Sequence, residues 1–487
     1  MSTMLPKFVL LWTDAVMWAL VVALLVYARV VWRSPNLRAS WTLVFRDAAA
    51  FASAIVLGLC LVLTLLDSIH FRRALPAAST GSPTAAKAYD TRTQSVLDSL
   101  LSRQIESREA TYSRPLAYQS FTLESLTVDG EVRRLPPRLL HGGAHLRDPQ
   151  RKWAGDIGAR VAAGLAIGAG AALLLGAWIV LGVARRNGWP WGEALGRVLR
   201  DETDIRWRAA LMMLTVLCLL VGPAALLMSD YHLLGTDRTG NDVLYQALKS
   251  IRTAFVIGTL ATVATLPLAV GLGLMAGYFK GWVDEAIQYL YTVLSSVPNV
   301  LLIAACVLMV QVFLDQHPEM FETGAERADL KLFLLCAILG VTGWAGLCRL
   351  LRAEALKLRE LEYVQAATAF GVGPWRIMVR HLLPNVMHLV LITTVLDFSG
   401  LILYEAVLSY VGVGVDPSMN SFGGMINLAR SEMSRDPLVW WSFAAAFGFM
   451  VTVVLAANFF ADGVRDAFDP RARVYRARRA PATGKAG

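Results

Sequence analysis

The sequence contains nine apolar runs of about twenty residues each, and few charged side chains interrupt them. A run of this kind predicts a membrane-spanning helix, because about 20 helical residues cross the hydrocarbon core of a bilayer. The bilayer favours helices because backbone N–H and C=O groups find no water there. The predicted spans are 8–32, 48–69, 158–183, 208–228, 254–277, 286–314, 331–349, 386–411 and 439–462. The expected fold is therefore an all-α polytopic membrane protein.

Basic residues cluster after the first, third and seventh predicted spans and in the C-terminal tail. Cytoplasmic loops carry an excess of Lys and Arg, so this alternation predicts an N-terminus outside and a C-terminus in the cytoplasm. The segment 72–157 falls outside although it contains many Arg, but loops of that length largely escape the rule. The apolar run from Phe8 is too long for the core of a cleavable signal peptide. The net charge of +9 comes largely from basic residues beside the predicted spans, so we expect these residues to lie next to the membrane and not to bind nucleic acid.

The sequence lacks the short motifs of ATPases and hydrolases. It has no GxxxxGK[ST] phosphate loop, no HExxH and no G-x-S-x-G, so we expect no catalytic residues. Its five cysteines and seven histidines show neither disulfide nor metal-ligand spacing. We therefore expect a chain that is not an enzyme and that holds no metal and no cofactor of its own.

The predicted spans divide the chain into regions of different character. Residues 1–71 hold two transmembrane helices, 72–157 form an extracytoplasmic insert, and 158–205 hold a third span and a cytoplasmic linker. A core of six spans is expected over 206–475, followed by a basic tail at 476–487.

The insert begins with a loop-like stretch at 74–87. Apolar residues at helical spacing predict a helix over 95–107. Alternating residues around an Asp-Gly turn predict a hairpin within 120–135. Such a subdomain serves either as a spacer or shield, or as the docking site of a partner.

Two glycine pairs have the spacing of close helix packing. Gly273 and Gly277 lie in the fifth predicted span, and Gly164 and Gly168 lie in the third. Small residues four apart let two helix backbones approach each other in a membrane. We expect both pairs to be packing faces and not parts of a dinucleotide site.

A polar segment at 351–385, called here the coupling segment, separates the seventh and eighth predicted spans. Its first part is amphipathic and rich in helix formers, which predicts one continuous helix. Gly371 and Gly373 are expected to end this helix, and Pro374 to start a second, short one. We expect Pro384 to interrupt the second helix. These features alone favour either an interfacial surface helix or a rigid rod that transmits a push from a cytoplasmic partner.

The coupling segment resembles the EAA motif of ABC importer permeases, with matching spacing. It departs from the motif at Gln365, where the family has Glu, and Glu362 lies one helical turn earlier as a substitute. The resemblance implies that this segment sits in a groove on a cytoplasmic ATPase. The implied coupling residues are Glu362, Gln365, Ala366, Ala367, Gly371, His381, Leu383 and Pro384.

Further motifs over residues 230–475 resemble the C-type permease subunit of dipeptide and oligopeptide importers. They include LLGTDRTGNDVL (233–244), AGYFKGWVDE (276–285), EAVLSYVGVGV (405–415) and SFGGMI (421–426). The resemblance implies a type I ABC importer permease fold and ATP-driven import of peptides or peptide-like solutes across a bacterial inner membrane. The implied partners are a second permease subunit, two cytoplasmic ATPases that hold ATP and Mg, and an extracytoplasmic solute-binding protein.

The segment 38–71 resembles the first span of such a permease. This resemblance implies that an insertion separates the family's first helix from the rest. The span at 208–228 is then expected to take its place before the 233–244 motif.

The 233–244 motif lies just outside the fourth predicted span. Asp237 and Asp242 are candidates to cap the following helix. The resemblance implies that this motif borders the external gate. The residues of this predicted gate are Gly235, Thr236, Asp237, Gly240 and Asp242.

Asp397 lies in the middle of the eighth predicted span, where a charge costs about 2.5–3.5 kcal/mol. It either lines the translocation path and meets the amino group of a peptide, or it makes a hydrogen bond to another helix. Glu405 is expected to be structural. Asp14, near the outer end of the first span, is expected to be exposed and without a role.

Two other classes of function remain open from the residues alone. An ion-coupled secondary transporter requires paired carboxylates at the membrane midplane or broken helices in inverted repeats. A membrane sensor or scaffold would use the 72–157 insert.

Overall fold

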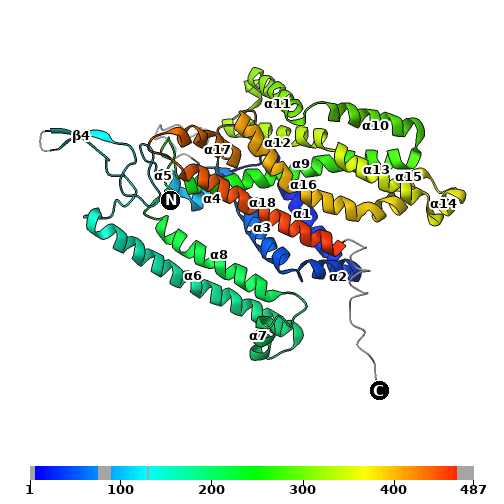
Figure 1. Ribbon diagram of the computed structural model, residues 1–487, viewed down its shortest axis with the longest axis horizontal. Coiled ribbons are helices and arrows are strands. Elements are labelled where there is room, and N and C mark those ends of the chain that lie inside the picture. Colours follow the sequence, from blue (N-terminus) through cyan, green and yellow to red (C-terminus); the bar gives the residue numbers. More distant parts are fainter. Residues whose placement is uncertain (1–5, 75–88, 91, 129–130, 469–487) are drawn as a thin grey trace, which may run out of the picture.

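The computed structural model describes residues 6–74, 89–90, 92–128 and 131–468, and most of them are helical (Figure 1). Within this part, eight helices are long and apolar enough to cross a membrane, or nine if a pair bent by 41° is one span. These correspond to the nine predicted spans. They are α1 Trp12–Arg33, α3 Ala48–Asp67, α6 Pro149–Asn187, α8 Trp207–Leu227, α9 Val243–Phe279, α11 Asn299–Gln316, the bent pair α12 Gly324–Gly343 and α13 Ala345–Arg359, the span Pro374–Val411, and α18 Trp441–Phe468.

Shorter elements connect these spans. They are β1 Lys7–Val9, α2 Pro35–Val44, β2 His70–Arg72, β3 Gln94–Ser95, α4 Val96–Leu100, α5 Ser102–Glu106, β4 Glu124–Val128, β5 Glu131–Leu135, α7 Trp191–Leu199, α10 Gly281–Ser296, α14 Glu362–Ala369 and α17 Phe422–Arg430. The span Pro374–Val411 itself contains α15 Pro374–Ile377 and α16 Leu383–Val411.

The long helix α9 lies at the centre of the core, where α3, α12, α13, α16 and α18 pack against it. Its two glycines let α13 come close. A Cβ atom on Gly273 would lie 2.9 Å from the Cβ of Leu351, and one on Gly277 would lie 2.5 Å from the Cβ of Ala355. The prediction that this glycine pair is a packing face is confirmed.

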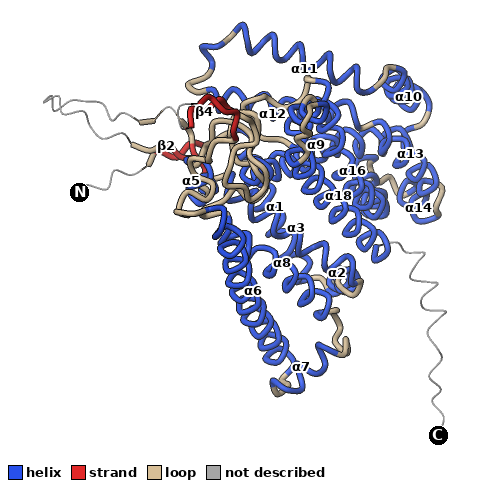
Figure 2. Tube along the Cα trace, turned by 60° about the vertical axis from the view of Figure 1, so that its left-hand side comes forward, coloured by secondary structure: helices blue, strands red, loops and turns tan. Residues whose placement is uncertain are grey.

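Helices α6 and α8 form an antiparallel pair beside the core (Figures 1 and 2). A Cβ atom on Gly164 would collide with the backbone of Pro223, and one on Gly168 with the carbonyl oxygen of Cys218, so this second packing face is also confirmed. Helix α6 begins at Pro149 and not near residue 158. The polar first turns of this helix carry no hydropathy signal, although proline suits a first helical position.

Helix α3 packs against both α9 and α18, as expected for the first helix of the core. A Cβ atom on Gly463 of α18 would collide with the Cβ of Ala50, so the two helices meet through small residues. Helix α8 instead packs along α6 and touches α3. Helix α8 precedes the 233–244 motif in the chain, as expected for the 208–228 span, whereas α3 makes the contacts with α9 and α18.

The predicted span at 286–314 is two helices, α10 and α11, and only α11 is long and apolar enough to span. The chain leaves the helical conformation at Val297, which has φ −90° and ψ 134°. Val297 precedes Pro298, and the residue before a proline is pushed towards extended conformations.

The insert lies at one end of the bundle, opposite the coupling segment (Figure 1). Strand β2 pairs with both β1 and β3, so the N-terminal strand is joined to the insert. The hairpin predicted within 120–135 is confirmed as β4 and β5. The helix predicted at 95–107 is broken into α4 and α5 at Leu101. Apart from Ala74, the loop-like stretch 74–87 lies outside the described residues, as does the predicted tail 476–487.

Candidate functional site

The backbone of the coupling segment turns at a glycine and a proline. Gly371 has a φ of +77°, in the left-handed region that favours glycine. Gly373 is the N-cap of α15, and Pro374 occupies the first turn of that helix. The predicted helix–turn–helix is therefore present at these residues.

Two details of the coupling segment differ from the sequence prediction. The first helix is not continuous, because α13 ends at Arg359 and α14 starts at Glu362 after an extended Leu361. Pro384 does not interrupt the second helix. It lies in the first turn of α16, and a π-helical turn at Met378–Leu382 joins α15 to α16 without a break. A proline lacks an N–H group and its ring crowds the carbonyl group of the preceding turn, and the wider π turn just before Pro384 gives room for both.

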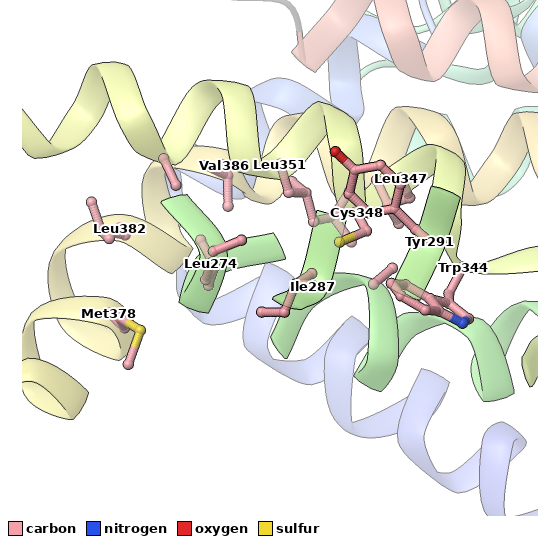
Figure 3. Packing of buried hydrophobic residues seen from close by; sticks show 14 of the residues in the cluster. Leu274, Ile287, Tyr291, Trp344, Leu347, Cys348, Leu351, Met378, Leu382 and Val386 are labelled. Atoms are coloured by element: carbon pink, nitrogen blue, oxygen red, sulfur yellow. The ribbon is translucent and has the colours of Figure 1, made fainter. Parts of the chain in front are cut away.

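One face of the coupling segment is anchored in the core. Val364, Ile377, Met378 and Leu382 are all buried in one apolar cluster with residues of α9, α10 and α13. Figure 3 shows Met378 and Leu382 near the side chains that α9 and α16 contribute. Because interiors of this kind are close-packed, a displacement of the segment moves the helices that hold it.

The other face of the coupling segment is uncovered. Phe370 is 87% exposed and Trp375 is 68% exposed. Both flank the turn at Gly371, and large exposed apolar side chains at one place mark an interaction site. The sequence analysis missed these two aromatic side chains because it concentrated on the small residues of the motif.

Most of the predicted coupling residues lie on this uncovered side. Glu362, Gln365, Ala366, Gly371 and Pro384 are exposed, whereas Ala367, His381 and Leu383 are half-buried. The side chain of Gln365 donates a hydrogen bond to the carbonyl oxygen of Glu360, 3.2 Å away. Glu362 lies in the first turn of α14.

Polar contacts connect the coupling segment to α9 and α10. The guanidinium of Arg352 makes two hydrogen bonds to Asp284 of α10, of 2.5 and 2.7 Å. Arg359 donates to the carbonyl oxygen of Tyr278 at 2.5 Å, and Lys280 pairs with Glu360 at 2.8 Å. These bonds hold the base of the segment to the end of α9.

At the opposite end of α9, the 233–244 motif forms a second candidate site. Asp242 caps α9, because its carboxylate accepts a hydrogen bond from the backbone N–H of Tyr245 at 3.0 Å. Asp237 does not cap a helix. Its carboxylate accepts from the N–H groups of Thr239 and Asn241 and closes the loop itself.

The insert packs directly onto this motif. Gly235 and Gly240 both have positive φ, and a Cβ atom on them would collide with the carbonyl oxygens of Ser113 and Glu109, respectively. The buried hydroxyl of Thr236 accepts from the N–H of Ser113 at 2.7 Å. The indole of Trp441 in α18 donates to the carbonyl oxygen of Thr236 at 2.9 Å. The motif thus joins the insert to two core helices.

His232 lies at the centre of this junction, and the sequence analysis gave it no role. Its Nδ1 lies 2.9 Å from Asp242, and its Nε2 lies 3.4 Å from Glu109 of the insert. Burial opposes the charged imidazolium, but the two carboxylates outweigh it and raise the pKa of His232 to about 9. Burial also opposes the Glu109 carboxylate, while His232 and three backbone N–H groups lower its pKa to about 2.

Asp397 lies on an exposed part of α16. Within the described residues it has no hydrogen-bond or ion-pair partner. The predicted alternative, a hydrogen bond from Asp397 to another helix, is therefore not found in this part of the chain. Exposed apolar side chains, Leu396 and Leu403, lie on the same helix. A carboxyl group at this depth needs a polar surrounding or a partner outside this chain.

Two acidic side chains of the spans are structural. Glu405 is buried, and the hydroxyl of Ser409 donates to it at 2.6 Å, as expected. Asp14 is also buried, so the expectation that it is exposed is wrong. The guanidinium of Arg252 and the imidazole of His70 each lie 2.7 Å from its carboxylate. The arginine inside the apolar run of α9 was the sequence signal for this pair.

Among the described residues, no group of three or more His, Cys, Asp or Glu side chains has the arrangement of a metal site.

Comparison with known proteins places these features in a family. The family described as binding-protein-dependent transport system inner membrane component matches residues 269–474, which include the whole coupling segment. The oligopeptide transport system permease protein OppC of Mycobacterium tuberculosis is 30% identical over 293 residues, which are 58% of this chain and 94% of that protein. The chain belongs to this family.

Other permeases are similar to this chain over about half of its length. OppC of Haemophilus influenzae is 31% identical over 250 residues, which are 51% of this chain and 74% of that protein. The dipeptide transport system permease protein DppC of Lactococcus lactis is 30% identical over 50% of this chain and 65% of that protein. A structure of the MetNI methionine ABC transporter in an inward-facing conformation is 17% identical, with a TM-score of 0.33, over 46% of this chain and 96% of that chain.

As a member of this family, the protein is a multi-pass inner-membrane component of a transport system. The curated relatives above are permease subunits and not enzymes. The family match begins at residue 269, within α9, so the four spans α1, α3, α6 and α8 and the insert lie before it.

Proposed function

We propose that this chain is the permease subunit of an ATP-driven importer for peptides or peptide-like solutes. The names of its relatives support this solute class, because they are oligopeptide and dipeptide transport permeases. The proposed partners are a second permease subunit, two cytoplasmic ATPases that hold ATP and Mg, and an extracytoplasmic solute-binding protein. In this arrangement the N-terminus lies outside and the C-terminus in the cytoplasm.

The observation that carries the proposal is the two-sided coupling segment. Its buried side, with Val364 and Leu382, belongs to the core, and its uncovered side presents Phe370 and Trp375. An ATPase that grips the uncovered side pushes on a rigid body. The push reaches α9 and α10 through the apolar cluster and through the bonds between Arg352 and Asp284.

ATP shifts the transporter between inward-open and outward-open states in this proposal. A ligand shifts such an equilibrium only by its difference in affinity for the two states. The ATPase pair must therefore bind ATP more tightly when it is closed. The coupling segment moves with the closing ATPase and shifts the membrane helices that hold it. The gate residues Gly235, Thr236, Asp237, Gly240 and Asp242 lie at the other end of α9 and border the external opening.

Asp397 is the proposed polar contact of the translocation path. It is exposed on α16 and lacks a partner within the described residues, so it is available to a second subunit or to a solute. The ammonium group of a peptide is the chemical group that such a carboxylate would attract.

The test combines assembly and transport. The double variant Phe370→Ala, Trp375→Ala is expected to lose co-purification with the ATPases and at least about tenfold of ATP-dependent peptide uptake, because truncation of a central aromatic contact costs about 2 kcal/mol or more. Trp191→Ala is the matched control, since Trp191 is 49% exposed but lies on α7, outside the coupling segment. Full uptake by a properly inserted double variant would contradict the proposal. ATP-independent uptake driven by an ion gradient would indicate a secondary transporter.

A further inference from the structure

A cavity of about 1070 Å³ opens between the N-terminal helices α1 and α2 on one side and α6 and α7 on the other. Figure 2 shows α2 and α7 at the same end of the molecule, away from the insert. Arg33 lies in the last turn of α1, and Arg185 and Arg186 lie in the last turns of α6. The cavity thus lies where these spans leave the membrane.

The lining of the cavity is strongly basic. It contains five arginines and only two acids, Glu202 and Asp204. Arg197 is already engaged, because it pairs with Glu193 at 2.5 Å and lies 4.1 Å above the ring of Trp189. The other four arginines make no ion pair within the part of the chain that the structure describes. These four, which we call the arginine group, are Arg33, Arg38, Arg185 and Arg186.

Tryptophans and apolar side chains continue the cavity towards the membrane. Trp32 of α1 and Trp178 of α6 line it and are 79% and 74% exposed. Tryptophan is enriched at the depth of lipid headgroups. Deeper in the membrane, α1 exposes Val26 and α6 exposes Leu174. Along α6 the order from the water inwards is therefore guanidinium groups, an indole ring and aliphatic side chains, which matches the order of phosphate, glycerol and acyl chains in a phospholipid.

The positive-inside rule alone accounts for arginines at the ends of spans. It does not account for the convergence on one cavity of four arginines that have no ion-pair partner among the described residues. Arg33 and Arg38 come from the end of α1 and from α2, and Arg185 and Arg186 come from the end of α6, more than a hundred residues later in the sequence. Guanidinium groups bind phosphate oxygens through paired hydrogen bonds, and basic pockets between spans bind anionic headgroups.

We propose that this cavity binds the phosphate headgroup of an anionic phospholipid, which lies in the cytoplasmic leaflet under the proposed orientation. The arginine group contacts the phosphate, Trp32 and Trp178 flank the glycerol region, and the acyl chains lie along α1 and α6. This site goes beyond the proposed function and lies before the family-matched residues 269–474. A failure of the site therefore leaves the import proposal intact.

The experiment measures lipid retention by the purified full-length chain. The chain is delipidated in detergent, mixed with equal amounts of phosphatidylglycerol and phosphatidylcholine, and examined by native mass spectrometry. The site variant is Arg38→Gln, Arg185→Gln, Arg186→Gln. The matched control is Arg200→Gln, Arg208→Gln, because both arginines are exposed near the same end but do not line the cavity. Thermal melting of each variant checks that it is folded.

The wild-type chain and the control are expected to retain phosphatidylglycerol in preference to phosphatidylcholine. The site variant is expected to lose this preference by about tenfold or more, because each basic residue near an anionic headgroup contributes a factor of about five. Equal retention of both lipids by the wild type, or an unchanged preference in a folded site variant, overturns the proposal.

A second arm separates a lipid from a soluble phosphate. Inorganic phosphate and glycerol 3-phosphate are titrated against bound phosphatidylglycerol. Retention of the lipid at millimolar concentrations of both competitors is the expected result. Displacement by either compound, lost in the site variant, assigns the cavity to a soluble phosphate ligand and overturns the lipid proposal.

Discussion

A guanidinium nitrogen of Arg252 lies 2.7 Å from a carboxylate oxygen of Asp14, and both side chains are buried. Arg252 belongs to α9, the central helix of the core, whereas Asp14 belongs to α1. Asp329 of α12 lies 3.6 Å from the same guanidinium group, and Thr13 accepts from it at 3.0 Å. This pair therefore joins α1 to the central helix α9 through charge as well as through packing.

The first prediction concerns this pair. Arg252→Ala is expected to destabilise the folded protein by about 3–5 kcal/mol, because it leaves two buried carboxylates without their cation. The measurement is the melting temperature in detergent together with the yield of monodisperse protein. Arg29→Ala serves as the control, since Arg29 is exposed on α1. A variant at Arg252 that melts like the control would show that the pair does not hold α1 to the core.

The second prediction concerns the contact between α9 and α13. Gly277→Leu is expected to destabilise the protein by about 1–3 kcal/mol, because the added atoms meet Ala355, whose Cβ lies 2.5 Å from the position of a Cβ at residue 277. Gly271→Leu on the same helix has open space and is expected to melt like the wild type. Ala355→Gly is expected to restore part of the stability to Gly277→Leu, and the absence of any rescue would argue against this contact.

The third prediction is a pH dependence of the junction between the insert and the core. The pKa of His232 is raised from 6.5 to about 9, so its stabilisation is fully present below pH 6.5 and is lost as the pH rises through about 9. The pKa of Glu109 is lowered from 4.5 to about 2, so its contribution is present above pH 4.5 and is lost as the pH falls through about 2. The junction is expected to be most stable between pH 4.5 and 6.5.

The measurement is the melting temperature of the wild type minus that of His232→Gln, as a function of pH. This difference is expected to fall between pH 6.5 and 9, because glutamine does not titrate. A difference that stays constant over this range would contradict the role given to His232.

The fourth prediction concerns Asp397. Asp397→Asn is expected to reduce peptide uptake about tenfold or more, because it removes the charge proposed to meet the solute, and hydrogen bonds to charged groups contribute about 1.5–3 kcal/mol. Co-purification with the ATPases is expected to stay unchanged, since the coupling segment is intact. Uptake is measured with the complete transporter in vesicles. Unchanged uptake by Asp397→Asn would remove this residue from the proposed path, and lost assembly would indicate a contact with another subunit.

The spans and the turn of the coupling segment were predictable because their causes are local. An apolar run of about twenty residues is enough to predict a membrane span. Gly371, Gly373 and Pro374 predict a turn through their own backbone preferences. The break of the 286–314 run at Pro298 also had a local cause, which the hydropathy of the run concealed.

Contacts between distant segments were not predictable in the same way. One side of the coupling segment is buried because Val364 packs against residues of α9 and α13. The sequence of the segment alone does not show which of its two sides packs against the core. The role of His232 depends on Glu109, which the insert brings to it from more than a hundred residues away. Helix α3 meets α18 where Ala50 faces Gly463, a match between small residues that carries no hydropathy signal.

The pairing of Asp14 with Arg252 also sets an order of events during biogenesis. The two residues are 238 positions apart, so a ribosome that adds about 5–20 residues per second makes the arginine roughly 10–50 seconds after the aspartate. For most of this interval the Asp14 carboxylate has the imidazole of His70, made 56 positions after it, as a partner but not yet the guanidinium group of Arg252. The contact between the first helix and the central helix α9 can therefore form only after Arg252 has been made.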